Sequence, residues 1–269
     1  MKTEARWLGF GRTETGLVRQ SNQDAFAAIN SRNFWIVADG MGGHPGGDVA
    51  AHTAVDIATE QAKALAAKHE DSAHTAGTEL VECLMAANRA IHEKMREEPS
   101  LKGMGTTVVA MTITPTPTPV AHIAHLGDSR AYRFHGGSLT QLTRDHTLVA
   151  VLLERGLIDE ATARAYPDRH VLAKGLGIAW DMRPELTAIP LTHSDLLLLC
   201  SDGLTKMLDD VDIASILSQA HGNCRRACHD LVEEALKRGG EDNVTVIVCA
   251  YTTPTKAGSL AIDKTPPAM

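Results

Sequence analysis

Three aspartates stand at the ends of strongly apolar segments that lie far apart in the sequence: Asp39, Asp202 and Asp242. The apolar segments are residues 34–38, 196–200 and 244–248. Because large apolar side chains dominate them, each segment is predicted to be a buried strand. The sequence therefore predicts strands that carry carboxylates at their ends, and these carboxylates are expected to form a cluster.

Clustered carboxylates repel one another and lose hydration, and a bound divalent cation removes both penalties. An all-oxygen ligand set suits Mg²⁺ or Mn²⁺, and the absence of cysteine and histidine at these strand ends argues against zinc. Gly40 and Gly203 follow two of the acids, and a glycine carbonyl can approach a cation without obstruction by a side chain. A single Asp-Gly pair is more often an ordinary turn. Three acids in the same relation to a buried strand favour a cation site.

The composition is that of a globular protein without a general affinity for nucleic acid. Of the 269 residues, 43% are hydrophobic and 22% are charged. The net charge is −7, whereas nucleic-acid binding usually needs a basic face. No run of about 18 apolar residues predicts a membrane span, and the first residues lack the apolar core of a signal peptide. The 5 cysteines, an odd number without framework spacing, indicate a reducing compartment, so a cytoplasmic protein is expected.

The order of predicted elements favours antiparallel sheets with helices outside, rather than a doubly wound parallel sheet. Strands come first, then helices over residues 48–68 and 78–97, then several strands, and finally two helices and a strand. Residues 147–176 interrupt this order with two short predicted helices and are interpreted as an inserted subdomain, called the flap below. Residues 253–269, which contain Thr, Pro and Lys, are predicted to be a disordered tail.

Seven short motifs follow one another along the chain. They are Arg-x-x-Asn-Gln-Asp from Arg19, Val-Ala-Asp-Gly-Met-Gly-Gly-His from Val37, Gly-Thr-Thr from Gly105, Leu-Gly-Asp-Ser-Arg from Leu126, Leu-Thr-Arg-Asp-His from Leu142, Cys-Ser-Asp-Gly-Leu from Cys200 and Asp-Asn-Val-Thr from Asp242. Each alone is weak, but their order and spacing over about residues 6–251 resemble the metal-dependent protein phosphatases, the protein phosphatase 2C family, in its bacterial form.

The resemblance implies an α+β fold, a four-layer α-β-β-α sandwich of two antiparallel sheets flanked by helix pairs, with residues 1–252 as the catalytic domain. It also implies two Mg²⁺ or Mn²⁺ ions. Asp39 would bridge them, the Gly40 carbonyl would complete one site, and Asp202 and Asp242 would complete the other. Asp24 would act mainly through metal-bound water.

Further roles follow from the same resemblance. Asp128, with Asp202, matches a third and weaker metal site. Arg19 would hold the substrate phosphate in the bidentate fork of its guanidinium group. Asn243 would orient Asp242 or water. His44 is a hypothetical general acid for the leaving oxygen, or it merely packs at the start of a helix.

The implied reaction is hydrolysis of phosphoserine and phosphothreonine. Two cations about 3.5–4 Å apart lower the pKa of a shared water, and the resulting hydroxide attacks phosphorus without a covalent enzyme intermediate. The flap matches a segment that influences substrate choice in the family, and here Tyr166-Pro167 stands where many bacterial members have His-Pro.

The leading hypothesis is a bacterial serine/threonine phosphatase, expected to be a monomer, that acts on phosphoproteins and opposes a Ser/Thr protein kinase. A catalytically weak regulatory or binding module on the same fold is the alternative. A two-metal nuclease is a third possibility, which the negative charge and the lack of a basic, aromatic groove disfavour. Cys224 and Cys228, spaced four apart on a predicted helix without a second ligand pair, are interpreted as structural rather than metal-binding.

Overall fold

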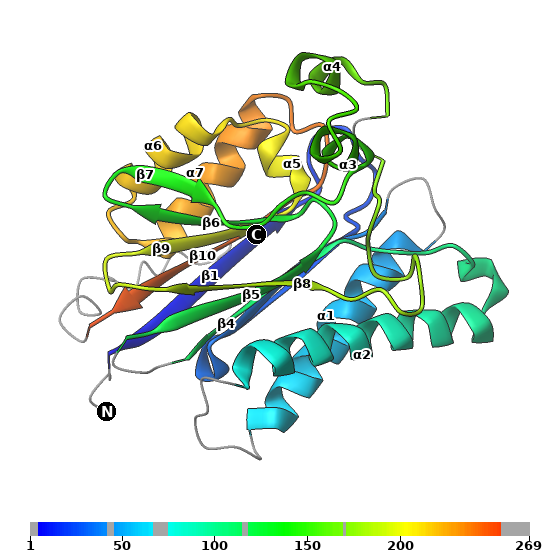
Figure 1. The fold of residues 1–269 in the computed structure, drawn as a ribbon. Helices are drawn as coiled ribbons and strands as arrows, with labels where there is room; N and C mark the ends of the chain where they lie inside the picture. The colour runs from blue at the N-terminus through cyan, green and yellow to red at the C-terminus, as the bar shows by residue number, and fades with distance from the viewer. Residues whose placement is uncertain (1–4, 42–45, 67–74, 115–117, 169–170, 254–269) are drawn as a thin grey trace, which may run out of the picture.

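The structure is a computed structural model that describes residues 5–41, 46–66, 75–114, 118–168 and 171–253. Within these ranges the chain forms two antiparallel five-stranded sheets stacked face to face, with helices on both outer faces (Figure 1). None of the helices in the described ranges is long and apolar enough to cross a membrane.

The first sheet joins the beginning of the chain to its last described strand. Its order is β1-β10-β9-β6-β7, with β1 Arg6–Glu14, β10 Val244–Thr252, β9 Leu196–Cys200, β6 Arg130–His135 and β7 Ser138–Gln141. The second sheet has the order β2-β3-β4-β5-β8, with β2 Asp24–Ile29, β3 Phe34–Asp39, β4 Val108–Thr114, β5 Val120–Leu126 and β8 Glu185–Pro190. All neighbouring strands pair antiparallel.

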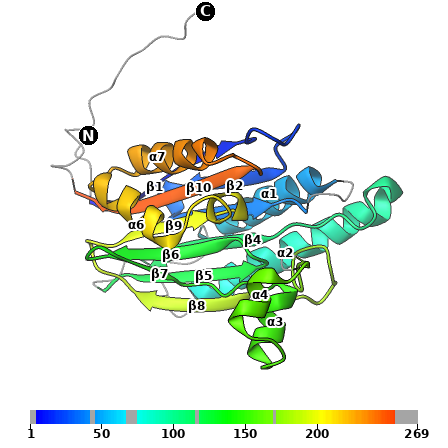
Figure 2. The same cartoon turned by 90° about the horizontal axis from the view of Figure 1, so that it is seen from above.

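Two helix pairs cover the outer faces of the sheets. The long helices α1 (Gly47–Ala66) and α2 (Ala76–Glu97) pack on the second sheet, and α6 (Asp210–Gln219) and α7 (Cys224–Lys237) pack on the first (Figure 2). Helix α2 buries Leu80, Leu84, Ala87 and Ile91, whose spacings of three and four residues put them on one face.

The central strands are apolar on both faces because each face meets another layer. In β3, Trp35 and Val37 pack between the two sheets, whereas Ile36 and Ala38 pack under α1 and α2. All four side chains are fully buried. This double burial explains why the segment reads as a continuous apolar run that ends abruptly at Asp39.

Smaller elements complete the chain: the 3-10 turns η1 (Asn30–Arg32) and η2 (Pro99–Leu101), and the short helices α3 (Leu148–Glu154), α4 (Glu160–Ala165) and α5 (Asp202–Thr205). Helices α3 and α4 lie in the flap and project beyond the end of the sandwich (Figure 1). Backbone hydrogen bonds between Thr106 and Leu176 join the end of the flap to the segment that precedes β4 of the second sheet.

The predicted α+β sandwich is confirmed, and most elements lie within a few residues of their expected positions. Helix α5 was not expected, since Asp202-Gly203 reads as a turn. The strand expected from Gly105 begins only at Val108, because Thr106 instead bridges to Gly40 and Leu176. The domain boundaries stay a prediction, and nearly all of the predicted tail, residues 254–269, lies outside the described residues.

Candidate metal centre

Both sheets contribute acids to one end of the sandwich. Asp24 begins β2 and Asp39 ends β3, and the two residues stand directly opposite each other in the strand pairing. In the first sheet, Asp202 follows β9 and Asp242 precedes its partner β10. A groove with a volume of about 800 Å³ is lined by acids of both sheets, namely Asp39, Asp128, Asp202 and Asp242.

Asp24 lies below the groove and is held by hydroxyl groups of the other sheet. Its Oδ2 accepts hydrogen bonds from Ser201 Oγ at 2.8 Å and Thr245 Oγ1 at 2.6 Å. Burial raises the pKa of Asp24 to about 6 against the opposing effect of these two bonds. Its other oxygen, Oδ1, is buried and has no hydrogen-bond partner among the described residues.

Burial and neighbouring carboxylates raise the pKa of two further acids, Asp39 and Asp128. The pKa of Asp39 lies well above its usual value because of burial, then because of Asp24 and Asp202. The pKa of Asp128 is raised to about 7, first by burial and then by Asp202 and Asp145. Asp202 Oδ1 is a second buried oxygen without a described partner. Orphaned buried oxygens and mutual repulsion are what a hard divalent cation relieves, so the donor set fits Mg²⁺ or Mn²⁺.

Gly203 allows the acids of the first sheet to lie close together. A Cβ atom at this position would stand 2.0 Å from the Asn243 carbonyl oxygen. With glycine, α5 begins against the backbone that carries Asp242. Gly40 is equally confined, since a Cβ there would meet the Gly47 carbonyl oxygen at 2.3 Å. Both glycines therefore serve close backbone packing, a role that the sequence does not reveal.

Within the described ranges, two cationic side chains contact these acids, those of Arg19 and Lys206. Arg19 contacts Asp242 through two nitrogen atoms: Nε lies 2.8 Å from Oδ1, and Nη2 lies 3.0 Å from Oδ2. Lys206, one helical turn beyond Asp202, contacts Asp202 Oδ2 at 2.6 Å and Asp242 Oδ2 at 2.8 Å. Burial alone would raise the pKa of Asp242, but Lys206 and Arg19 bring it below its usual value.

Asn243 acts mainly on the N-terminal loop. Its side-chain Nδ2 donates to the carbonyl oxygens of Thr15 and Ser21, and its Oδ1 accepts from the Gln23 backbone N–H. Only its backbone N–H reaches Asp242, at 3.0 Å from Oδ1. Asn243 therefore joins the start of β10 to the loop that carries Arg19.

The structure brings together the predicted residues Arg19, Asp24, Asp39, Gly40, Asp128, Asp202 and Asp242, and their individual roles stay predictions. His44 lies outside the described residues. Sequence reasoning assigned no role to Lys206, or to Ser201 and Thr245, which stand in two of the motifs. The spacing of four between Asp202 and Lys206 was the available signal for the lysine, but it has meaning only on a helix.

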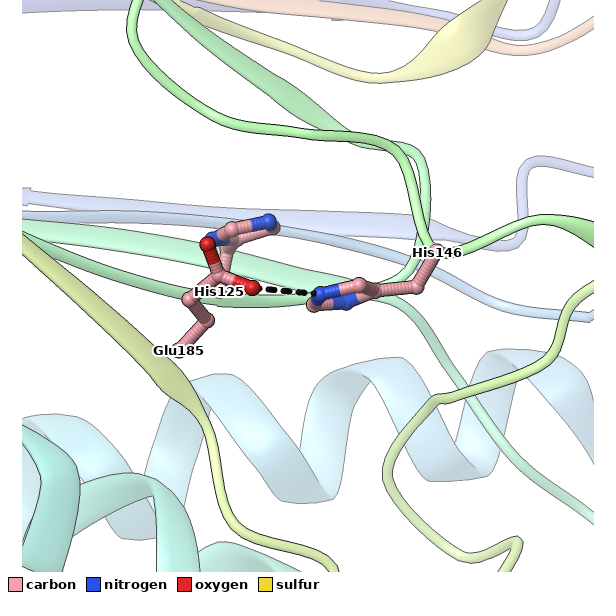
Figure 3. A group of neighbouring side chains, drawn as sticks. All are labelled: His125, His146 and Glu185. Atoms are coloured by element: carbon pink, nitrogen blue, oxygen red, sulfur yellow. Dashed lines mark hydrogen bonds and ion pairs between the residues drawn. The ribbon is translucent and has the colours of Figure 1, made fainter. Parts of the chain in front are cut away.

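A second group of candidate ligands, His125, His146 and Glu185, lies on the second sheet and beside it (Figure 3). The His146 ring receives the Gly127 N–H at Nδ1, so its proton is on Nε2, 3.1 Å from Glu185 Oε2. The two imidazoles are stacked and nearly parallel, with centroids 4.6 Å apart. A cation binds an imidazole nitrogen in the plane of the ring, and parallel stacked rings share no such plane. The group is therefore a hydrogen-bonded packing cluster in this geometry.

A four-layer α-β-β-α sandwich with an acidic groove at one end of its sheets defines a class of α+β proteins with a candidate divalent-metal centre. The family model described as protein phosphatase 2C matches residues 18–238. The chain is 35% identical over 240 residues to the serine/threonine phosphatase Stp of Listeria welshimeri, covering 88% of this chain and 93% of that protein. It therefore belongs to the protein phosphatase 2C family, as the sequence motifs predicted.

Solved structures agree with this assignment. The serine/threonine phosphatase Stp1 of Staphylococcus aureus matches with a TM-score of 0.81 at 30% identity, covering 93% of this chain and 97% of that one. The catalytic domain of the serine/threonine protein phosphatase PstP, a structure with two manganese ions, matches with a TM-score of 0.76 at 32% identity, covering 92% and 99%.

Proposed function

We propose that this chain is a Mg²⁺- or Mn²⁺-dependent serine/threonine protein phosphatase that hydrolyses phosphoserine and phosphothreonine. The observation that carries the proposal is the convergence of carboxylates from both sheets on one groove, with buried oxygens of Asp24 and Asp202 left without partners among the described residues. The two manganese ions of the related PstP domain support divalent cations as the cofactor.

The carboxylates are assigned by the resemblance of their motifs to the family. Asp39, the Gly40 carbonyl, Asp202 and Asp242 would hold the divalent ions, and all four residues line the groove. Asp24, buried below, would act through water. Two divalent cations supply a water of lowered pKa and shield the charge of the phosphate. Such shielding matters because phosphate monoesters hydrolyse up to about 10²¹-fold more slowly without an enzyme.

Arg19 is proposed to bind the substrate phosphate at the edge of the groove. Its two-nitrogen contact, through Nε and Nη2, is made with Asp242 and not kept for phosphate as the sequence suggested. This contact fixes the plane of the guanidinium group, and Nη1 is proposed to bind a phosphate oxygen. Its side chain is 44% exposed, so a phosphorylated side chain can reach it from solvent. Asp242 thus orients the arginine as well as contributing to the cation site.

The test is release of phosphate from a phosphothreonine peptide with Mn²⁺, with EDTA, and with the variant Asp39→Asn. Chelation is expected to abolish release. Asp39→Asn is expected to reduce kcat by about 10²–10³-fold or more, because it removes charge from the centre where the transition state is stabilised. Activity that persists in EDTA would reject the proposal.

His44 is proposed as the general acid for the leaving serine or threonine oxygen. His44→Ala is expected to slow hydrolysis of a phosphopeptide far more than that of an aryl phosphate, whose leaving group needs no proton. Equal losses on both substrates would remove this role.

The expected cellular setting is also a proposal: a monomer in a bacterial cytoplasm that acts on phosphoproteins and opposes a Ser/Thr protein kinase. The alternative, a regulatory module without catalysis, is not favoured because four of the predicted acids, Asp39, Asp128, Asp202 and Asp242, line the groove. Calorimetric titration with Mn²⁺ separates the two, since a module without catalysis need not bind the ion.

A further inference from the structure

Lys206 places an ammonium group among the acids of the groove. It follows the last residue of α5, and its Nζ contacts Asp202 Oδ2 at 2.6 Å and Asp242 Oδ2 at 2.8 Å. Its side chain is 26% exposed, so the contacts lie partly out of solvent. A single turn of helix fixes the lysine relative to Asp202, which is four residues earlier.

The charge around Lys206 is strongly negative. Burial would lower the pKa of its ammonium group, but Asp202 and Asp242 raise the pKa above its usual value. Lys206 also lies near enough to Asp128 to act against the rise in the pKa of that carboxyl group. Among the described residues, Arg19 is the other cation in contact with Asp242, and it approaches from the N-terminal loop. Lys206 is therefore the cation shared by the two acids of the first sheet.

We propose that Lys206 is an internal counter-cation that competes with the divalent ion for Asp202 and Asp242. The proposal rests on the function above only in taking these two aspartates as ligands of a metal ion. It concerns a residue to which the sequence motifs give no role.

The contacts of Lys206 have two opposite consequences: they stabilise the metal-free fold, and they weaken the binding of a divalent ion. In the metal-free protein, the lysine compensates two carboxylates that would otherwise repel each other, so it stabilises the fold. When a divalent ion binds, the ammonium must release at least one carboxylate oxygen or remain close to a second cation. Either outcome weakens cation binding, because like charges at such distances interact strongly in a partly buried site.

The test uses Lys206→Met, which keeps an unbranched apolar side chain, one atom shorter than that of lysine, and removes its charge. Calorimetric titration with Mn²⁺ is expected to show about tenfold or tighter binding in this variant, since the competing charge is gone. Thermal unfolding in EDTA is expected to show a lower Tm than wild type. The rise in Tm on adding saturating Mn²⁺ is expected to be larger in the variant.

Two control variants isolate the position of the charge. Lys206→Arg retains a cation and is expected to bind Mn²⁺ with an affinity close to that of wild type. Lys237→Met removes the same charge from a side chain on α7 that is 70% exposed and does not line the groove, so it is expected to leave Mn²⁺ affinity unchanged. Together they distinguish competition at the two acids from a change in net charge.

The Mn²⁺ affinity of Lys206→Met decides between competition and a merely structural role for the lysine. A merely structural role for Lys206 would give weaker Mn²⁺ binding in Lys206→Met, because disorder of α5 would move Asp202. Unchanged or weaker binding would therefore overturn the inference while leaving the proposed phosphatase intact. A wild-type protein that binds no Mn²⁺ would instead reject both. Equal tightening in Lys237→Met would assign the effect to net charge and also overturn the inference.

Discussion

Asp24 and Asp39 stand opposite each other on paired strands, a position at which two like charges destabilise a sheet. The protein tolerates the pair because Ser201 and Thr245 donate hydrogen bonds to Asp24. Asp39 could be predicted from its place at the end of an apolar segment, and Asp24 from the resemblance of its motif to the family. Their hydroxyl and ammonium partners could not, because nothing in the sequence says which side chains from the other sheet will face them.

The raised pKa values give the metal-free protein a particular pH dependence. The pKa is about 6 for Asp24 and about 7 for Asp128, whereas unfolded aspartate titrates near its ordinary value of about 3.9. Stability from these groups is present in full below the unfolded pKa and is lost as pH rises through the folded pKa. In EDTA, the free energy of unfolding should therefore fall between pH 6.5 and pH 8.

Asp128→Asn tests this expectation by removing one of the titrating groups. The variant should lose about 1 kcal/mol less stability than wild type over this pH interval, as measured by urea unfolding in EDTA. Burial lowers the pKa of His125 and His146. Two such histidines reduce the free energy of unfolding only as pH falls below the unfolded pKa of about 6.5, so they do not contribute between pH 6.5 and pH 8. A wild-type slope unchanged by the substitution would contradict the assignment to Asp128.

At the scale of elements, the longer helices and the strands could be predicted because their apolar periodicity reflects the layer that each face contacts. Helix α5 could not, since four residues carry no periodicity and Asp-Gly is typical of a turn. This short helix nevertheless determines where Asp202 and Lys206 point. The acids of the groove were thus predictable, but the element that orients one of them was not.

Gly203→Ala is expected to disturb this element selectively. The added Cβ would collide with the Asn243 carbonyl oxygen, a backbone atom that cannot easily move, so α5 must shift away from β10. Mn²⁺ affinity should fall by about tenfold or more, as a misplaced ligand costs at least 1.4 kcal/mol or so. Calorimetry measures the loss, and a far-UV spectrum like that of wild type would show that the sheets persist. Undiminished affinity would contradict the proposed packing role.

In the flap, α4 begins at an N-cap that the structure identifies. The Asp159 side chain accepts a hydrogen bond from the Thr162 backbone N–H at 2.8 Å. Asp159→Ala should destabilise α4 locally by about 1 kcal/mol. Hydrogen exchange should therefore quicken across Glu160–Ala165 while the Tm of the whole protein stays the same. Exchange unchanged in α4 would show that packing, and not the cap, maintains the helix.

At the scale of the whole molecule, the ordered motifs predicted the family, and the alternation of element types predicted the sandwich. The acidic groove forms where the two sheets stack on each other. The order of motifs along the chain gives no distances between residues of different sheets, so it could not predict the groove. Asn243 illustrates the difference. Its motif placed it beside Asp242, but the structure shows its side chain binding Thr15, Ser21 and Gln23, more than two hundred residues earlier.

Cation binding is expected to stabilise the whole fold, because the acids come from both sheets. Mn²⁺ at a hundredfold excess over its Kd should add about 2.7 kcal/mol to the free energy of unfolding. For a chain of this length, the Tm should rise by about 5–10 °C. Differential scanning calorimetry with and without EDTA measures the shift. Asp39→Asn should abolish most of it, and a full shift in that variant would place the ion elsewhere.

The pairing of β1 with β10 has a consequence for synthesis of the protein. A ribosome that has translated everything up to β9 has not yet made Asp242, Asn243 or the strand that separates β1 from β9 in the sheet. In the growing polypeptide, β1 therefore has no β10 to pair with, and the groove lacks the residues that Asp242 and Asn243 contribute to its lining. Both the first sheet and the acidic groove are therefore completed only by the last described strand and the residues just before it.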